Sequence, residues 1–134
     1  MTYETLNPAP RLLSATSLMS DAVYNHKEEK LGDIKDMMLN IHSGTVSYAV
    51  LSFGGFLGMG EKLFAVPWSA LTLDTVNKRF VLNVETDSLE NAPGFDKDHW
   101  PDMADPTWAQ SIHTYYGTQY ETQADPDKPN VPLL

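Results

Sequence analysis

The residues with the clearest potential for chemistry form a glycine-rich segment, Phe53-Gly54-Gly55-Phe56-Leu57-Gly58-Met59-Gly60-Glu61-Lys62. Such a loop can bind phosphate where a helix follows it, because the free N–H groups of the helix N-terminus face the anion. Here Glu61 stands where a P-loop has its lysine, no hydroxyl residue follows Lys62, and the spacing G-x-G-x-x-G is absent. The next residues have the pattern of a strand. We therefore predict a packed connection between two strands rather than a phosphate site.

The acidic segment that starts at Asp96 is the best candidate for a metal site, with Asp96, Asp98 and Asp102 as candidate ligands. Carboxylate oxygens are ligands that suit calcium or magnesium. A calcium loop begun at Asp96 would need an acid or amide at its fifth position and glycine at its sixth, where the chain has Trp100 and Pro101. We therefore interpret the segment as a solvated link, and we predict no metal and no cofactor.

The remaining residues do not assemble into a catalytic pattern. The four histidines include no pair spaced four residues apart on one helix, and no serine lies in a G-x-S-x-G elbow. The chain has no cysteine, which excludes a disulfide framework, a thiolate metal site and a cysteine nucleophile. We therefore predict that the protein is not an enzyme.

Length and charge limit the domain count and the partners. The chain has 134 residues, which fits one domain, and nine Lys and Arg against eighteen Asp and Glu give a formal net charge of −9. A surface of this sign repels a polyanion, so we predict no nucleic acid partner. Residues 91–134 carry −5 of the −9, so we expect an electrostatic partner to be basic and to meet this part first.

The elements that would position these residues are mostly strands. Short apolar runs separated by turn residues predict strands over residues 12–18, 22–25, 31–41, 45–53, 63–68, 70–74 and 79–84. In the fourth run, Val46, Tyr48 and Val50 alternate with their neighbours at the period of two that a strand requires. Pro67 marks a strand end or an edge, because proline lacks the ladder N–H. With no helix between them, these strands predict a small antiparallel β-barrel or sandwich.

Helical patterns come only after these strands. Asp87-Ser88-Leu89-Glu90 resembles a capping box ahead of one short turn, which Pro93-Gly94 ends. Asp105-Pro106 supplies an N-cap and a first-turn proline for a helix over residues 107–116, and Gly117 ends that helix.

The C-terminal region carries an unusual aromatic load. The residues in question are Trp100, Trp108, Tyr115 and Tyr116. Trp108, Ile112 and the two tyrosines fall at three- to four-residue spacing, so they form a stripe on the predicted helix. We expect this stripe to pack on the barrel or on a second subunit. Aromatic residues are favoured at interfaces, so we expect self-association, as a homodimer.

The glycine-rich loop carries apolar side chains as well, at Phe56, Leu57 and Met59. Loops lie at the surface, so exposed apolar groups on one of them indicate a contact site. The equal alternative is that they fold back as a plug over the mouth of the barrel.

Several segments, in consistent order over residues 12–95, resemble the PRC-barrel domain family. They are Gly32-Asp33-Ile34-Lys35-Asp36, the run from Val46 through the glycine-rich loop to Gly60, Val66-Pro67-Trp68, and Leu89 with Ala92-Pro93-Gly94-Phe95. The family includes the cytoplasmic part of the photosynthetic reaction-centre H subunit, the C-terminal domain of a ribosome maturation factor, and free-standing bacterial proteins.

The resemblance implies a mainly β protein, a small antiparallel PRC-type barrel, here with a short C-terminal helical extension. It also implies roles through contacts with other proteins and no catalytic constellation. The residues of this chain that match the family motif, and that form a candidate contact loop, are Gly54, Gly55, Phe56, Leu57, Gly58, Met59, Gly60, Pro67 and Trp68.

We expect four parts: an extended lead-in over residues 1–11, the barrel over 12–95, an acidic aromatic extension over 96–120 and a flexible tail over 121–134. The first 20 residues hold one basic residue and an interrupted apolar pattern, unlike a signal peptide. No apolar run approaches the length of a membrane span. We therefore expect a cytoplasmic protein without membrane insertion.

The leading hypothesis is a non-catalytic protein-interaction module that self-associates. The alternative is a small-ligand-binding barrel that uses the mouth near the Gly54–Gly60 loop, although side chains usually fill barrels of this size. A ribosome-associated or RNA-processing factor is the third hypothesis, and the negative charge disfavours it.

Overall fold

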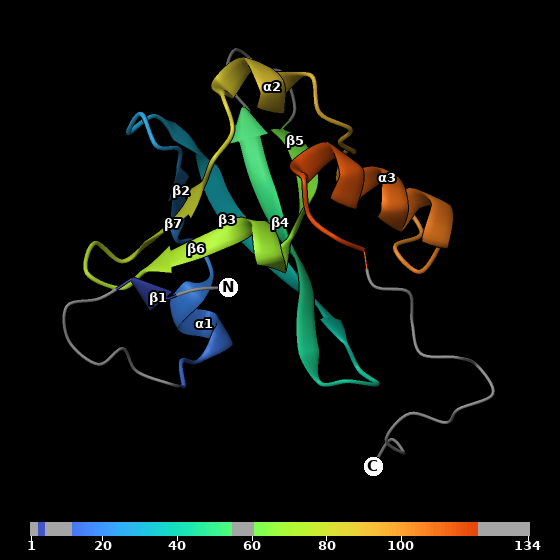
Figure 1. The fold of residues 1–134 in the computed structure, drawn as a ribbon, viewed down its shortest axis with the longest axis horizontal. Helices are drawn as coiled ribbons and strands as arrows, with labels where there is room; N and C mark the ends of the chain where they lie inside the picture. Colours follow the sequence, from blue (N-terminus) through green and yellow to red (C-terminus); the bar gives the residue numbers. More distant parts are fainter. Residues whose placement is uncertain (1–2, 5–11, 55–60, 121–134) are drawn as a thin grey trace.

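One curled sheet dominates the computed structural model, which describes residues 3–4, 12–54 and 61–120 (Figure 1). The strands of the described residues are β1 (Tyr3–Glu4), β2 (Ala22–Tyr24), β3 (Lys30–Asn40), β4 (Thr45–Gly54), β5 (Glu61–Pro67), β6 (Leu71–Asp74) and β7 (Arg79–Leu82). Their order across the sheet is β1-β6-β7-β2-β3-β4-β5. β2 to β7 form a six-stranded half-barrel, which confirms the prediction of a mainly β fold with a C-terminal helix.

The strand pairing is antiparallel except at two places. β2 lies parallel to β7, with Val23 beside Phe80, and the short β1 lies parallel to β6. β3 and β4, which correspond to the predicted strands over residues 31–41 and 45–53, form a long hairpin. It is paired from Asp33 with Ser52 out to Asn40 with Thr45. Register shifts occur along this hairpin, and such bulges bend and twist a sheet so that it curls.

Gly32 lets β3 pass close to β4. A Cβ atom at this position would overlap the carbonyl oxygen of Ser52, so only glycine fits without moving the backbone. Gly32 begins one of the segments that resemble the family, and the close approach of β4 explains why that segment has glycine there.

The expected strand over residues 12–18 is wrong, because the chain forms the short helix α1 (Ala15–Leu18) there. Ser14 caps this helix: its Oγ accepts a hydrogen bond from the N–H of Ser17 at 3.2 Å. The hydroxyl of Ser17 in turn donates to the carbonyl oxygen of Ser14 at 2.7 Å. These local side-chain bonds give the backbone an alternative to strand pairing.

Three further helices follow the strands or interrupt them, namely the 3-10 helix η1 (Trp68–Ala70), α2 (Thr86–Glu90) and α3 (Pro106–Tyr116). α3 has the predicted ends, since Asp105 accepts from the N–H of Thr107 at 3.0 Å and Gly117 adopts a left-handed φ of 71°. α2 exists as predicted, but Glu85 is its N-cap and Asp87 lies in its first turn, so the capping box is wrong. No helix of the described residues is long and apolar enough to span a membrane.

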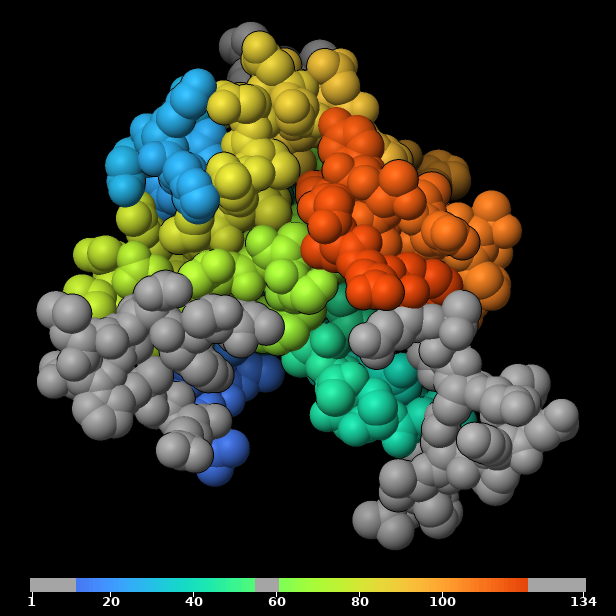
Figure 2. Space-filling model, in the orientation of Figure 1, coloured from blue at the N-terminus to red at the C-terminus, as the bar shows by residue number. Residues whose placement is uncertain are grey.

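The core has two parts, one on each face of the sheet. The inner part includes the fully buried side chains Leu31, Phe64 and Phe80. Burying a side chain of this size contributes roughly 1.5–3 kcal/mol to folding. The outer part centres on Tyr48 and Ile112, because α3 packs against this face of the sheet. Figure 2 shows the atoms of α3, in orange, at the surface beside those of the β3–β4 hairpin, in teal. The predicted helix therefore packs on its own sheet.

Candidate functional site

The segment between α2 and α3 is fixed to the edge of the sheet by Phe95. Its N–H donates to the carbonyl oxygen of Leu63 on β5, and the N–H of Leu63 donates to the carbonyl oxygen of Phe95, both at 2.8 Å. The Lys62 ammonium donates to the carbonyl oxygens of Glu90 and Ala92 at 3.1 and 3.2 Å, which holds the end of α2 nearby. The start of the acidic segment is thus positioned by backbone pairing.

Trp100 lies on Phe95 and remains partly open to solvent. The two ring centroids are 5.0 Å apart, and the indole Nε1 donates to the carbonyl oxygen of Lys97 at 3.0 Å. The residue is still 41% exposed. A large aromatic side chain is therefore held in one place while it presents surface to solvent. The sequence identified Phe95 only as part of the segment Ala92-Pro93-Gly94-Phe95, and it did not predict that Phe95 supports Trp100.

Of the three aspartates proposed as weak metal ligands, Asp96 and Asp102 accept hydrogen bonds from nearby residues. Asp96 accepts from the N–H of Asp98 at 2.8 Å and pairs with Nδ1 of His99 at 2.7 Å, and the bond from His99 is the main reason that the pKa of Asp96 lies below its usual value. Asp102 accepts from the N–H of Ala104 at 3.0 Å. Within the described ranges, no three His, Asp or Glu side chains gather as a metal site would require.

The predicted interface aromatics divide into two groups. Trp108 meets the ring of Tyr48 edge-on at 5.3 Å, and Tyr116 is partly buried beside it, so both pack on the protein's own sheet. Tyr115 is 40% exposed, and its hydroxyl donates to the carbonyl oxygen of Ser88 on α2. Trp100 and Tyr115 are therefore the two that keep substantial surface exposed to solvent.

The predicted contact loop is described only at its ends. Gly54 closes β4 with a φ of 92° and pairs with Glu61, the first residue of β5. A strand follows the glycine-rich segment, as predicted, where a phosphate loop would need a helix. The rest of the loop, Gly55, Phe56, Leu57, Gly58, Met59 and Gly60, lies outside the described residues. Of the remaining motif residues, Pro67 is buried at the end of β5, and Trp68 packs on Phe80 with ring centroids 5.6 Å apart.

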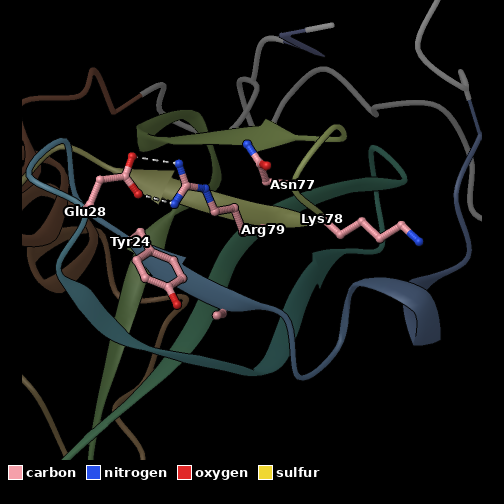
Figure 3. A pocket seen from close by; sticks show the side chains of 6 residues that line it. Tyr24, Glu28, Asn77, Lys78 and Arg79 are labelled. Carbon is pink, nitrogen blue, oxygen red and sulfur yellow. Dashed lines mark hydrogen bonds and ion pairs between the residues drawn. The ribbon is translucent and has the colours of Figure 1, made fainter.

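A polar hollow of about 560 Å³ lies between the β2–β3 turn and the β6–β7 turn (Figure 3). The Arg79 guanidinium donates to both carboxylate oxygens of Glu28, at 2.5 and 3.0 Å, and to Asp74 at 3.3 Å. It also lies 4.9 Å from the ring centroid of Tyr24. The bonds from Arg79 are the main reason that the pKa of Glu28 lies below its usual value. These charges therefore pair with one another and join the two turns. We call Arg79, Glu28 and Asp74 the Arg79 clamp.

A comparison of the sequence with known protein families agrees with this architecture. The model of the PRC-barrel domain matches residues 10–89, which include β2 to β7 and most of α2. No curated protein matches the chain. Phe95, Trp100 and α3 lie beyond the matched residues. Because the match covers more than half of the 134 residues and the sheet curls as a half-barrel, the chain belongs to the PRC-barrel domain family.

Proposed function

We propose that this protein is a non-catalytic interaction module that binds a basic segment of another protein. The contact is the acidic aromatic surface, which we define as Phe95, Trp100 and the carboxylates of Asp96, Asp98 and Asp102. The observation that carries the proposal is Trp100, which is held on Phe95 and bonded to the backbone yet is 41% exposed. A rigid aromatic side chain loses little conformational entropy when a partner covers it.

The charge around Trp100 indicates the chemistry of the partner. Residues 85–105 contain seven acidic residues and one lysine. An arginine side chain can stack on an indole face and pair with carboxylates at the same time, which a lysine does less well. Tryptophan and arginine are also enriched among the residues that dominate binding energy. We therefore infer an arginine-containing segment, which the negative field would steer toward this surface.

The family and the charge pairing support a role without catalysis. PRC-barrel domains are generally non-catalytic. In the polar hollow, the most obvious cluster of charged side chains in the described part, Arg79 is bonded to Glu28 and Asp74. Groups neutralised by such bonds are poor general acids or bases near neutral pH, because their pKa values move away from it.

The test is a fluorescence anisotropy titration with a labelled nona-arginine peptide, and with nona-lysine for comparison. We expect tighter binding of the arginine peptide and a loss of at least about five-fold with Trp100→Ala. Asp98→Asn should weaken binding further than Asp36→Asn, a charge-matched change on β3. The proposal is wrong if Trp100→Ala binds both peptides as the wild type does.

A further inference from the structure

The outer part of the β3–β4 hairpin lies in a stretch without formal charge. Residues 37–60 contain no Asp, Glu, Lys or Arg, although 20% of the chain is charged and a stretch of this length would hold about five such residues. We define the uncharged arm as residues 37–46, the part that ends in the hairpin turn. The arm therefore carries no formal charge, unlike the acidic surface around Trp100.

The uncharged arm projects past the rest of the sheet (Figure 1). It also exposes apolar side chains. Leu39 is 64% exposed and Ile41 is 71% exposed. Val46 pairs with Leu39 across the hairpin and is half-buried. Exposed aliphatic residues that come together in this way indicate a surface that another molecule covers.

The end of the arm is ordered by its own hydrogen bonds. The side-chain oxygen of Asn40 accepts from the N–H groups of His42 and Ser43 at 2.9 and 3.3 Å. The N–H of Gly44 donates to the carbonyl oxygen of Asn40 at 2.8 Å. A turn fixed in this way presents Leu39 and Ile41 in one geometry, so little ordering is needed on binding.

We propose that a second copy of this chain covers the uncharged arm, and that the protein forms a two-fold symmetric dimer, arm against arm. Each copy carries a formal charge of −9, so most surfaces of two copies repel one another. The uncharged arm is a surface where two copies can bury apolar area without facing carboxylates. A strongly charged partner would instead lose solvation against an arm that cannot pair with it. The inference uses residues different from those of the proposed function and stands independently of it.

The two-fold axis makes a sharp test available, because each residue near the axis meets its own copy. The experiment is sedimentation equilibrium of the full chain over roughly 1–300 µM, a range suited to a small interface. We expect the wild type to associate, and Leu39→Glu and Leu39→Lys each to weaken association at least about ten-fold. Leu39→Lys lowers the net negative charge, so general repulsion cannot explain its effect. A mixture of the two variants should associate again, because opposite charges then meet across the axis.

Val76→Glu is the matched control, since Val76 is 63% exposed and lies on the β6–β7 turn, outside the arm. It should associate as the wild type does, and all variants should keep the wild-type circular dichroism spectrum. A wild type that stays monomeric over the whole range overturns the inference, as does association that neither Leu39 variant weakens. Association that appears only after deletion of residues 121–134 also overturns it, because that segment would then be the occupant of the arm.

Discussion

Phe95 and Leu63 exchange two backbone hydrogen bonds of 2.8 Å, although 32 positions separate them in the sequence. This bridge covers part of the free edge of β5, whose outward N–H and C=O groups would otherwise be open to another strand. It also sets the place from which the acidic segment starts, and hence where Trp100 lies. A small piece of backbone pairing thus links the family domain to the surface that follows it.

Gly94→Ala should disturb this link. A Cβ atom at position 94 would lie 2.8 Å from the carbonyl oxygen of Leu63 and 2.7 Å from Cε of Lys62, so the backbone must shift. We expect the free energy of unfolding to fall by about 1–3 kcal/mol, measured by urea denaturation. Gly44→Ala is the comparison: its Cβ meets open space, and only its φ of 73° opposes the change, at about 1 kcal/mol. A smaller loss for Gly94→Ala than for Gly44→Ala would contradict the steric argument.

Tyr115 and Tyr116 offer a pair of hydroxyl deletions with opposite signs. Among the described residues, the Tyr116 hydroxyl is buried without a hydrogen-bond partner, so Tyr116→Phe should raise the free energy of unfolding by about 1 kcal/mol. Tyr115→Phe removes the bond to the carbonyl oxygen of Ser88 and should lower it by about 0.5–1 kcal/mol. Chemical denaturation of both variants checks the signs, and two changes of the same sign would refute this assignment.

Ile112 is the buried anchor of α3 on the outer face of the sheet. Ile112→Ala leaves a cavity beside Tyr48 and should lower the free energy of unfolding by about 2–5 kcal/mol. Near-ultraviolet circular dichroism should report the change as well, because Tyr48 and Trp108 lose their packing there. Gln110→Ala, on the exposed side of the same helix, should alter neither measurement.

The Arg79 clamp should make the free energy of unfolding depend on pH in the acidic range. Arg79 lowers the pKa of Glu28 below its ordinary value of 4.5, while Asn77 and then Arg79 lower that of Asp74 below 3.8. A carboxyl with a lowered pKa in the folded state contributes stability that is present above its unfolded pKa and lost as the pH falls through the folded pKa. The stability gap between wild type and Arg79→Met should therefore narrow as the pH is lowered from about 6 to about 3.

Urea midpoints measured across this pH range give the comparison. Lys78→Met removes the same formal charge from the adjacent residue and serves as the control, with a gap that should stay nearly constant. If the gap for Arg79→Met is equally constant, the clamp does not contribute through the ionised carboxylates.

Local sequence patterns explain most of the elements but not how they pair. The β3–β4 hairpin and the two ends of α3 follow from alternation, from Ser43-Gly44 and from the caps at Asp105 and Gly117, all of which act over a few residues. The parallel pairing of β2 with β7 has no local signal, because it joins strands from distant parts of the chain. The helix α1 formed in place of an expected strand because of a local interaction, the N-cap at Ser14, which outweighed the apolar pattern.

The candidate surface was predictable in composition and not in geometry. The acidic and aromatic residues around Trp100 are evident in the sequence, whereas the support by Phe95 depends on a bridge to a strand far away. The aromatic stripe that includes Trp108 and Tyr116 was compatible with two arrangements, packing on the barrel or packing on another subunit. The structure shows the first for these residues, because they pack near Tyr48 on the protein's own sheet.

The parallel ladder between β2 and β7 also has a consequence for how the chain folds. It consists of Val23 beside Phe80 and Tyr24 beside Val81, and it joins the β6–β7 hairpin to the β2–β3–β4–β5 meander. Both of those units can form from nearby residues, whereas the ladder must close a long loop and pay its entropy first. We therefore expect the hairpins to form early and this seam to close late, with the bonds between Arg79 and Glu28 securing it once the two units have met.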